Sequence, residues 1–108
     1  MVIYTNLFIP KRYAARVIGP IILIRPASKD DIGLLNHEKT HVRQFYRTFG
    51  LYGILNRFKK HRLNFEIEAY KEQLKYGGTV EAYADYLVNN YNLSITKEEA
   101  IGRLTWEN

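Results

Sequence analysis

The chain has 108 residues, a net charge of +5 and no cysteine. This length predicts a single domain over residues 1–108, and a hydrophobic content of 46% allows a real but small core. Without cysteine, disulfides and thiolate zinc sites are excluded, so any metal must be bound by His, Asp or Glu. The positive charge favours an acidic partner, such as a nucleic acid or a membrane surface, only weakly.

The N-terminus has no basic region followed by a long apolar run, as a signal peptide would. The longest apolar stretch, residues 18–24, is interrupted by Gly19 and Pro20 and is too short to span a bilayer. We therefore expect a cytoplasmic protein that has no membrane partner.

The first 27 residues are rich in β-branched and aromatic residues, which favours strands. Strands are predicted at Val2–Tyr4, Ala14–Ile18 and Ile21–Arg25. Pro20 and Pro26 bracket the last of these, which suits an edge position. We expect a small antiparallel sheet of two or three strands.

From Ser28 onward the pattern is helical, and capping residues and glycines indicate where each helix begins and ends. Residues 51–63 are aromatic and basic, and their pattern predicts no definite element. The predicted fold is α+β, with the N-terminal sheet followed by three or four helices. These helices are expected at 28–49 (before Gly50), at 64–76 (before Gly77), at 80–91, and from the Thr96–Glu99 capping box toward Trp106.

The segment from His37 to His41 has the spacing of a zinc site on a helix. His37 and His41 are one turn apart and project from the same face, so both imidazoles can bind one ion. Glu38 lies about 100° around the helix, where it can act as a general base but is poorly placed as a third ligand.

The next helix contains a candidate third ligand, Glu66. On a helical projection Glu66 lies at the centre of the apolar face, whereas Glu68 belongs to the charged face. A buried, unpaired carboxylate is costly, and a metal cation would explain it. The alternative is that Glu66 pairs with a buried arginine, for instance Arg43.

His37-Glu38-x-x-His41, followed after 24 residues by Glu66, resembles the gluzincin metallopeptidases, and most closely the minimal single-domain members called minigluzincins. The resemblance covers roughly residues 21–73. It implies a zincin-like fold, one zinc ion bound by His37, His41 and Glu66, and Glu38 as the general base. It further implies metalloendopeptidase activity on peptide or protein substrates. A substrate would add as a strand along residues 21–25, a segment that contains Ile22, Leu23 and Ile24.

Two positions depart from the gluzincin pattern. Tyr70 stands where many members have an Asp that orients a ligand histidine, and its hydroxyl could make a similar bond without charge. Lys39 occupies a position that is normally uncharged. Candidates for stabilising the oxyanion are Tyr46, Tyr70, His61 and a tyrosine of the C-terminal half, and the sequence does not choose among them.

Other functions remain open. The basic and aromatic run Arg57–Arg62 could bind nucleic acid, although a solvated basic face is the preferred interpretation, with His61 as a surface residue. The protein could bind zinc without catalysis. It could also be a zymogen-like latent enzyme whose tail, residues 92–108 with Trp106, lies across the cleft.

Overall fold

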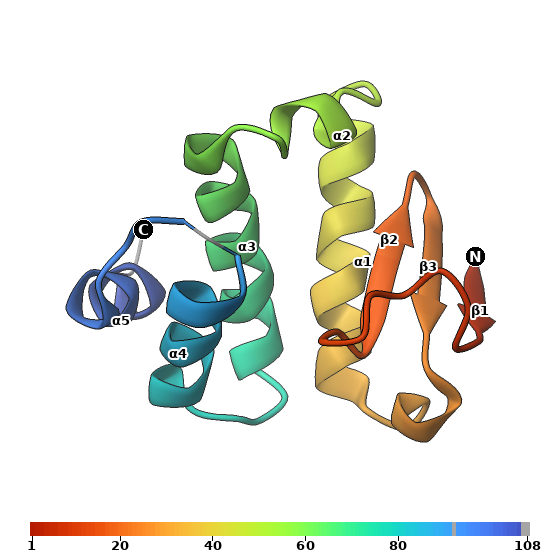
Figure 1. The fold of residues 1–108 in the computed structure, drawn as a ribbon, viewed down its shortest axis with the longest axis horizontal. Coiled ribbons are helices and arrows are strands. Elements are labelled where there is room, and N and C mark those ends of the chain that lie inside the picture. Colours follow the sequence, from red (N-terminus) through yellow and green to blue (C-terminus); the bar gives the residue numbers. More distant parts are fainter. Residues whose placement is uncertain (92, 107–108) are drawn as a thin grey trace.

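The computed structural model describes residues 1–91 and 93–106. It has the α+β architecture predicted from the sequence, with a small N-terminal sheet followed by helices (Figure 1). The elements in chain order are β1 (Val2–Tyr4), β2 (Ala15–Ile18), β3 (Ile21–Ile24), the 3-10 turn η1 (Pro26–Ser28), α1 (Ile32–Arg47), α2 (Tyr52–Leu55), α3 (Lys59–Leu74), α4 (Val80–Asn90) and α5 (Lys97–Thr105).

The sheet is mixed rather than purely antiparallel, and its strand order is β1-β3-β2. β2 and β3 form an antiparallel hairpin, and the turn between them begins at Gly19, whose φ of +59° a two-residue turn of this kind requires. β1 pairs in parallel with the other side of β3.

The prediction that residues 21–25 form an edge strand is therefore wrong. Pro20 and Pro26 lie just outside β3, so neither removes a donor from the paired residues. Ile22, Leu23 and Ile24 are buried in the central strand, and a substrate cannot pair with them. The free edge beside the helices belongs to β2.

Helix α1 begins later than expected. Ser28 ends the short turn η1, and the side chain of Asp31 caps α1 by accepting a hydrogen bond from the Leu34 N–H at 2.9 Å. The helix ends at Arg47, two residues before the predicted position, and Gly50 takes a left-handed backbone with φ +83°.

Helix α3 begins at Lys59, five residues before the predicted start. Asn64 lies inside this helix rather than at its cap, and its Oδ1 accepts a hydrogen bond from Arg103 at 2.7 Å. The short helix α2 occupies part of the segment for which the sequence predicted no element. Together these elements link the C-terminal end of α1 to the start of α3.

Helices α4 and α5 agree closely with the prediction. Thr79 caps α4, and Thr96 with Glu99 forms the predicted capping box of α5. α5 packs against α3 and α4 on the side away from the sheet (Figure 1). The tail expected to cover the cleft therefore lies elsewhere, at least over residues 93–106; residues 92, 107 and 108 are outside the described part.

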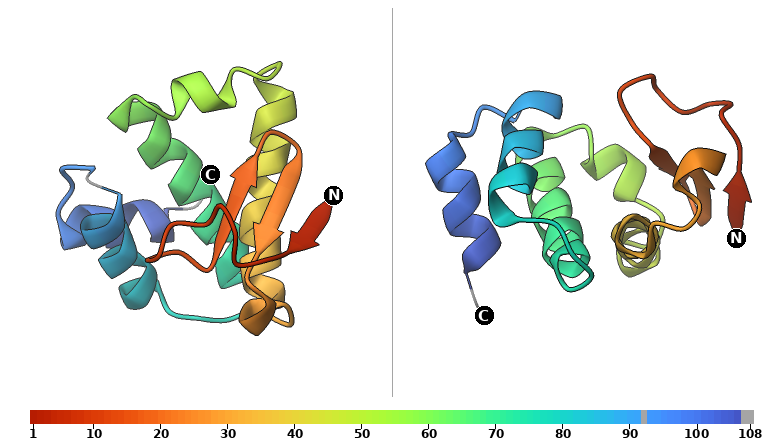
Figure 2. Two further views of the ribbon diagram at one scale, coloured as in Figure 1. Left: turned by 45° about the vertical axis from the view of Figure 1, so that its right-hand side comes forward. Right: turned by 90° about the horizontal axis from the view of Figure 1, so that it is seen from below.

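Helix α1 lies between the sheet and α3, and the other views show the same order of layers (Figure 2). One apolar cluster joins the sheet to α1 through Ala15, Ile22 and Ile24. A larger one joins α3, α4 and α5 and includes Ala84, Leu87 and other side chains. The interface between α1 and α3, where the predicted ligands lie, is the place where these two halves meet. Among the described residues, no helix is long and apolar enough to cross a membrane.

Candidate metal centre

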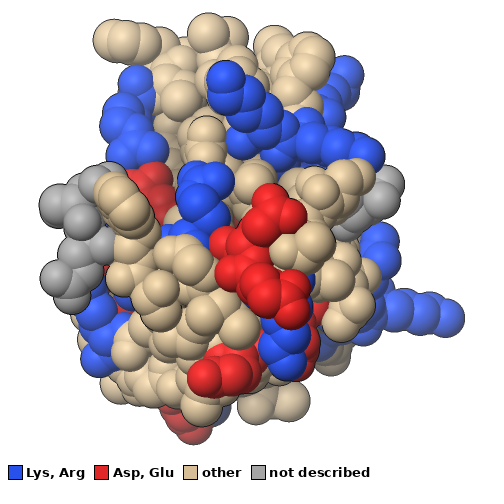
Figure 3. Space-filling view, turned by 90° about the vertical axis from the view of Figure 1, so that its left-hand side faces the viewer, with Lys and Arg blue, Asp and Glu red and all other residues tan. Residues whose placement is uncertain are grey.

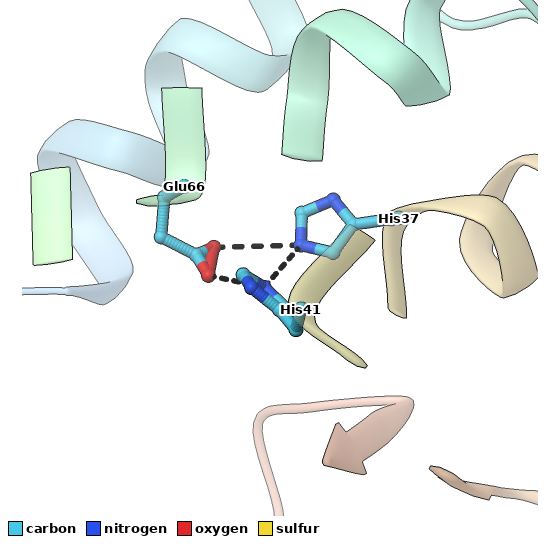
Figure 4. Close-up of side chains that lie close together, drawn as sticks. All are labelled: His37, His41 and Glu66. Carbon is cyan, nitrogen blue, oxygen red and sulfur yellow. Dashed lines mark hydrogen bonds and ion pairs between the residues drawn. The ribbon is translucent and has the colours of Figure 1, made fainter. Parts of the chain in front are cut away.

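His37 and His41 project from one face of α1 toward α3, as the spacing predicted. Both residues are only 4% exposed, and their Nε2 atoms are 3.3 Å apart. Glu66 of α3 points at the pair from the opposite side (Figure 4). Its Oε1 is 2.6 Å from Nε2 of His41, and its Oε2 is 3.4 Å from Nε2 of His37. The three side chains form a buried group that could hold a metal ion.

The helical projection of α3 correctly separated its two carboxylates. Glu66 lies among the buried residues of the helix, whereas Glu68 is half-buried and pairs with Arg47 at 2.7 Å. The alternative partner for Glu66, Arg43, instead donates to the hydroxyl of Thr40 at 2.9 Å. Glu66 therefore meets the two histidines rather than an arginine.

The spacing of the two histidine nitrogens fits a single small cation. Two nitrogens bound to one tetrahedral zinc ion at about 2.0–2.1 Å would lie about 3.3 Å apart. The observed separation between the two Nε2 atoms is 3.3 Å. Glu66 Oε2 is buried without a hydrogen-bond partner, which is costly for a carboxylate oxygen. The donor set and this unpartnered atom both fit a metal at this position.

Gln44 fixes the orientation of His41. This glutamine is fully buried, and its amide Nε2 donates to the Phe65 carbonyl at 3.0 Å and to Glu68 Oε1 at 2.8 Å. Because both amide N–H groups already donate, its Oε1 must accept a hydrogen bond from the N–H at Nδ1 of His41, 2.8 Å away. Nδ1 is then protonated, and Nε2 is the nitrogen directed at the metal position.

Without a metal, His41 and Glu66 form a tight ion pair. Burial favours a lower pKa for His41, but the charge and hydrogen bond of Glu66 dominate and raise this pKa to about 9. Burial would raise the pKa of Glu66, yet the two histidines hold it well below its ordinary value. In the metal-free protein at neutral pH, a proton therefore occupies the position between Nε2 of His41 and the carboxylate.

Glu38 is adjacent to the ligands and is only 7% exposed, and it lines the same cavity. Burial raises its pKa, while the neighbouring histidines act in the opposite direction. A carboxylate whose pKa is raised toward neutrality is better suited to accept and return a proton than an ordinary exposed glutamate.

The group opens into a cleft of about 800 Å³. Its floor is α1, one wall is β2, and the other is built from α3 and the end of α4. In an antiparallel pair, the main-chain N–H and C=O groups of successive residues point alternately toward and away from the partner strand. The Ala14 carbonyl points toward β3, because it accepts a hydrogen bond from the Arg25 N–H. The main-chain groups of Ala15 and Val17 therefore point away from β3. This free edge faces the cleft.

Tyrosine hydroxyls surround the cleft. The ring of Tyr70 packs edge-on against His37 with centroids 4.4 Å apart, and its hydroxyl lies 2.7 Å from that of Tyr91 rather than bonding the histidine. Tyr52 packs against His41. Tyr46, one of the candidates for stabilising an oxyanion, is 63% exposed and does not line the cleft. His61 is exposed, as expected of a surface residue.

A loop from β1 to β2 crosses the cleft on the side opposite α1. The hydroxyl of Tyr13 donates to the Asn90 carbonyl at 2.8 Å, and its ring stacks on Tyr91. Arg25 holds this loop by donating to several main-chain carbonyls in residues 6–13, including that of Tyr13. The loop therefore ties the sheet half of the molecule to the helical half.

Two residues of the site, Gln44 and Tyr13, did not emerge from the sequence, and Tyr91 was included only as an unspecified tyrosine of the C-terminal half. Gln44 was detectable in principle, because it lies three residues after a ligand histidine and thus one turn along the same helix. Tyr13 and Tyr91 approach the site only through tertiary contacts, and no local spacing connects them to it.

Comparison of the chain with protein-family models, curated proteins and solved structures found no significant match.

Proposed function

We propose that this protein is a zinc-dependent peptidase of the gluzincin type. The observation that supports this most strongly is the buried group of His37, His41 and Glu66 with Glu38 beside it in an open cleft. Two imidazoles and a carboxylate are a recurrent ligand set of catalytic zinc, which leaves one coordination position open. The same spacing supports the proposed resemblance to minigluzincins.

The chemistry of the ligands favours zinc over calcium and magnesium. Calcium and magnesium prefer sites made only of oxygen atoms, whereas two imidazoles suit zinc. Zinc held by these residues would lower the pKa of a water molecule toward about 7 and polarise the carbonyl of the scissile peptide bond.

Glu38 is the proposed general base. Its carboxylate takes a proton as the nucleophile forms and then delivers that proton to the leaving amine. Its burial next to the ligands and its raised pKa support this role. His41 would be held in the correct orientation by Gln44 throughout.

The hydroxyl pair of Tyr70 and Tyr91 is the proposed oxyanion donor. Two phenols have two protons, but only one of these can lie in the 2.7 Å bond between them. The second proton is available to an acceptor in the cleft, which both residues line. A donor fixed before the substrate arrives stabilises developing negative charge without reorganisation.

The free edge of β2 is the proposed substrate-binding strand. An extended peptide could pair with the main-chain groups of Ala15 and Val17. Main-chain pairing supplies affinity for any extended peptide, so the substrate class would be flexible polypeptide rather than a small molecule.

The test is to compare wild-type protein with Glu38→Gln, both loaded with one equivalent of zinc. Hydrolysis of an unfolded casein with quenched fluorophores should be metal-dependent. It should fall by about 10²- to 10⁴-fold in Glu38→Gln, the range expected for loss of a general base. The variant should retain zinc and its thermal midpoint.

A second variant, Glu72→Gln, provides the matched control, since it removes a carboxylate of α3 that pairs with Lys75 and contacts neither the ligands nor Gln44. Its activity should remain close to that of wild type. If zinc-loaded wild type cleaves no unfolded protein, or if Glu38→Gln is as active as wild type, the proposal is wrong.

A further inference from the structure

The positive charge of this protein is concentrated in one stretch. Residues 39–65 contain seven of the 16 Lys and Arg residues and no Asp or Glu. In the remaining chain, the 11 acidic residues outnumber the basic ones. The net charge of +5 is therefore a property of this stretch, which runs from α1 through α2 into α3.

The same stretch forms one end of the molecule, at the top of Figure 1. Lysine and arginine side chains lie along the upper part of the face in Figure 3, whereas the cluster of Asp and Glu lies lower. Arg57, Lys59 and Lys60 are all exposed at this end. The first acidic residues that follow are the buried Glu66 and Glu68, which pairs with Arg47.

Large apolar side chains stand among these basic residues. Phe49 is 95% exposed, and Leu51, Ile54 and Phe58 are each more than half exposed. Phe49 also has a left-handed backbone with φ +55°, a conformation that suits Gly or Asn better than an aromatic residue. Neither packing nor backbone geometry favours phenylalanine at this position, so an intermolecular contact is the physical explanation that remains.

We propose that this end, defined by Phe49, Leu51, Ile54, Arg57 and Lys60 and called the basic apolar tip, docks onto an anionic membrane surface. Basic side chains are attracted to acidic lipid headgroups, while exposed apolar side chains enter the boundary between headgroups and acyl chains. The tip combines both features at one end of the molecule. The protein would lie on the membrane without crossing it, which revises the expectation of no membrane partner.

The composition of the basic apolar tip favours lipid over the other partners. A single-stranded nucleic acid stacks its bases on flat aromatic rings, which Phe49 and Phe58 offer, but the aliphatic Leu51 and Ile54 between them provide no such surface. A second copy of this chain would bring two positive surfaces together, which is repulsive. An anionic bilayer satisfies both the charge and the aliphatic side chains.

Docking through the tip would place the cleft beside the membrane. Three residues that lie between Phe49 and Ile54 of the basic apolar tip also line the cleft, namely Gly50, Tyr52 and Gly53. Resting on the proposed peptidase activity, this position would favour unfolded polypeptide close to a bilayer as substrate. The docking itself does not depend on the activity, and its test uses no measurement of hydrolysis.

The test is co-sedimentation of the full chain with vesicles of phosphatidylcholine alone and with vesicles in which about a third of the lipid is phosphatidylserine. We expect binding only to the anionic vesicles, and weaker binding as salt is added. Arg57→Gln with Lys60→Gln should lower the partition coefficient by about 25-fold, since each basic residue contributes about fivefold. Phe49→Asn leaves the charge unchanged and should lower it by about tenfold.

Lys29→Gln with Lys75→Gln is the matched control, because it removes the same charge from the opposite end of the molecule. If the two double variants weaken binding equally, or if wild type does not bind anionic vesicles, the proposal is wrong. It is also wrong if single-stranded DNA binds more tightly than the vesicles and Phe49→Asn weakens that DNA binding, which would assign the tip to nucleic acid. Sedimentation velocity showing a dimer that Phe49→Asn dissociates would assign the tip to a second copy instead.

Discussion

Gln44 offers the sharpest test of how the site is built, because it touches neither the cleft nor a substrate. Its three hydrogen bonds connect His41 of α1 to Phe65 and Glu68 of α3. Gln44→Met keeps a similar volume and removes all three bonds. If Gln44 orients the ligand nitrogen, the variant should bind zinc about 10- to 100-fold more weakly, the range for losing a hydrogen bond behind a metal ligand.

The same substitution should destabilise the metal-free protein. The buried Nδ1–H of His41 loses its acceptor, which costs about 1–3 kcal/mol. The other two partners lose less, because the Phe65 carbonyl retains its helical hydrogen bond and Glu68 retains Arg47. We therefore expect the free energy of unfolding to fall by about 2–4 kcal/mol in urea titrations.

Zinc affinity would be measured by competition with a chromophoric chelator, on protein shown by circular dichroism to be folded. Gln73→Met is the matched control, since Gln73 lies in the wall of the cleft rather than behind a ligand. Gln73→Met should leave zinc affinity within about twofold of wild type, because His41 keeps Gln44 as its hydrogen-bond acceptor. A folded Gln44→Met protein with wild-type zinc affinity would refute the assignment.

Three further predictions concern protons and the loop over the cleft. Because the pKa of His41 is raised to about 9 in the metal-free protein, it is protonated below that pH. Zinc binding at pH 7 should then release about one proton from His41. Calorimetry in two buffers of different ionisation enthalpy would measure this release, and a value of zero would contradict the ion pair between His41 and Glu66. Tyr70→Phe and Tyr91→Phe should each lower kcat about 10²-fold with KM little changed, because either change breaks the hydroxyl pair that fixes the donor. The double variant should therefore be no worse than either single variant, and additive losses would argue against a donor that depends on both hydroxyls. Arg25→Met should lower the free energy of unfolding by about 2–4 kcal/mol in urea, because it releases several carbonyls of residues 6–13; an unchanged midpoint would show that the loop does not depend on this side chain.

The parts of the structure that the sequence predicted are those governed by local spacing. The two histidines share a face because they are one helical turn apart, and Glu66 could be distinguished from Glu68 because its apolar neighbours define the buried face of α3. The cap at Thr96 was likewise visible in four consecutive residues.

The errors arose where distant segments decide the outcome. The order of strands depends on β1 pairing with β3 rather than with β2, the next strand in the sequence, and no local pattern encodes this choice. Tyr46 lies close to His41 in sequence, yet five residues along a helix is not the same face, and its side chain points outward. The start of α3 was obscured because its first turn has no side-chain cap.

The ligand group joins two helices that an unfolded chain would leave far apart. Because that chain has no preformed site, a metal would bind only the folded state, and each tenfold rise in free metal above the dissociation constant would add about 1.4 kcal/mol of stability. The chain has no cysteine and therefore no disulfide to stabilise it, so its resistance to proteolysis would depend on the concentration of free metal. The amount of intact protein would then vary with the metal supply.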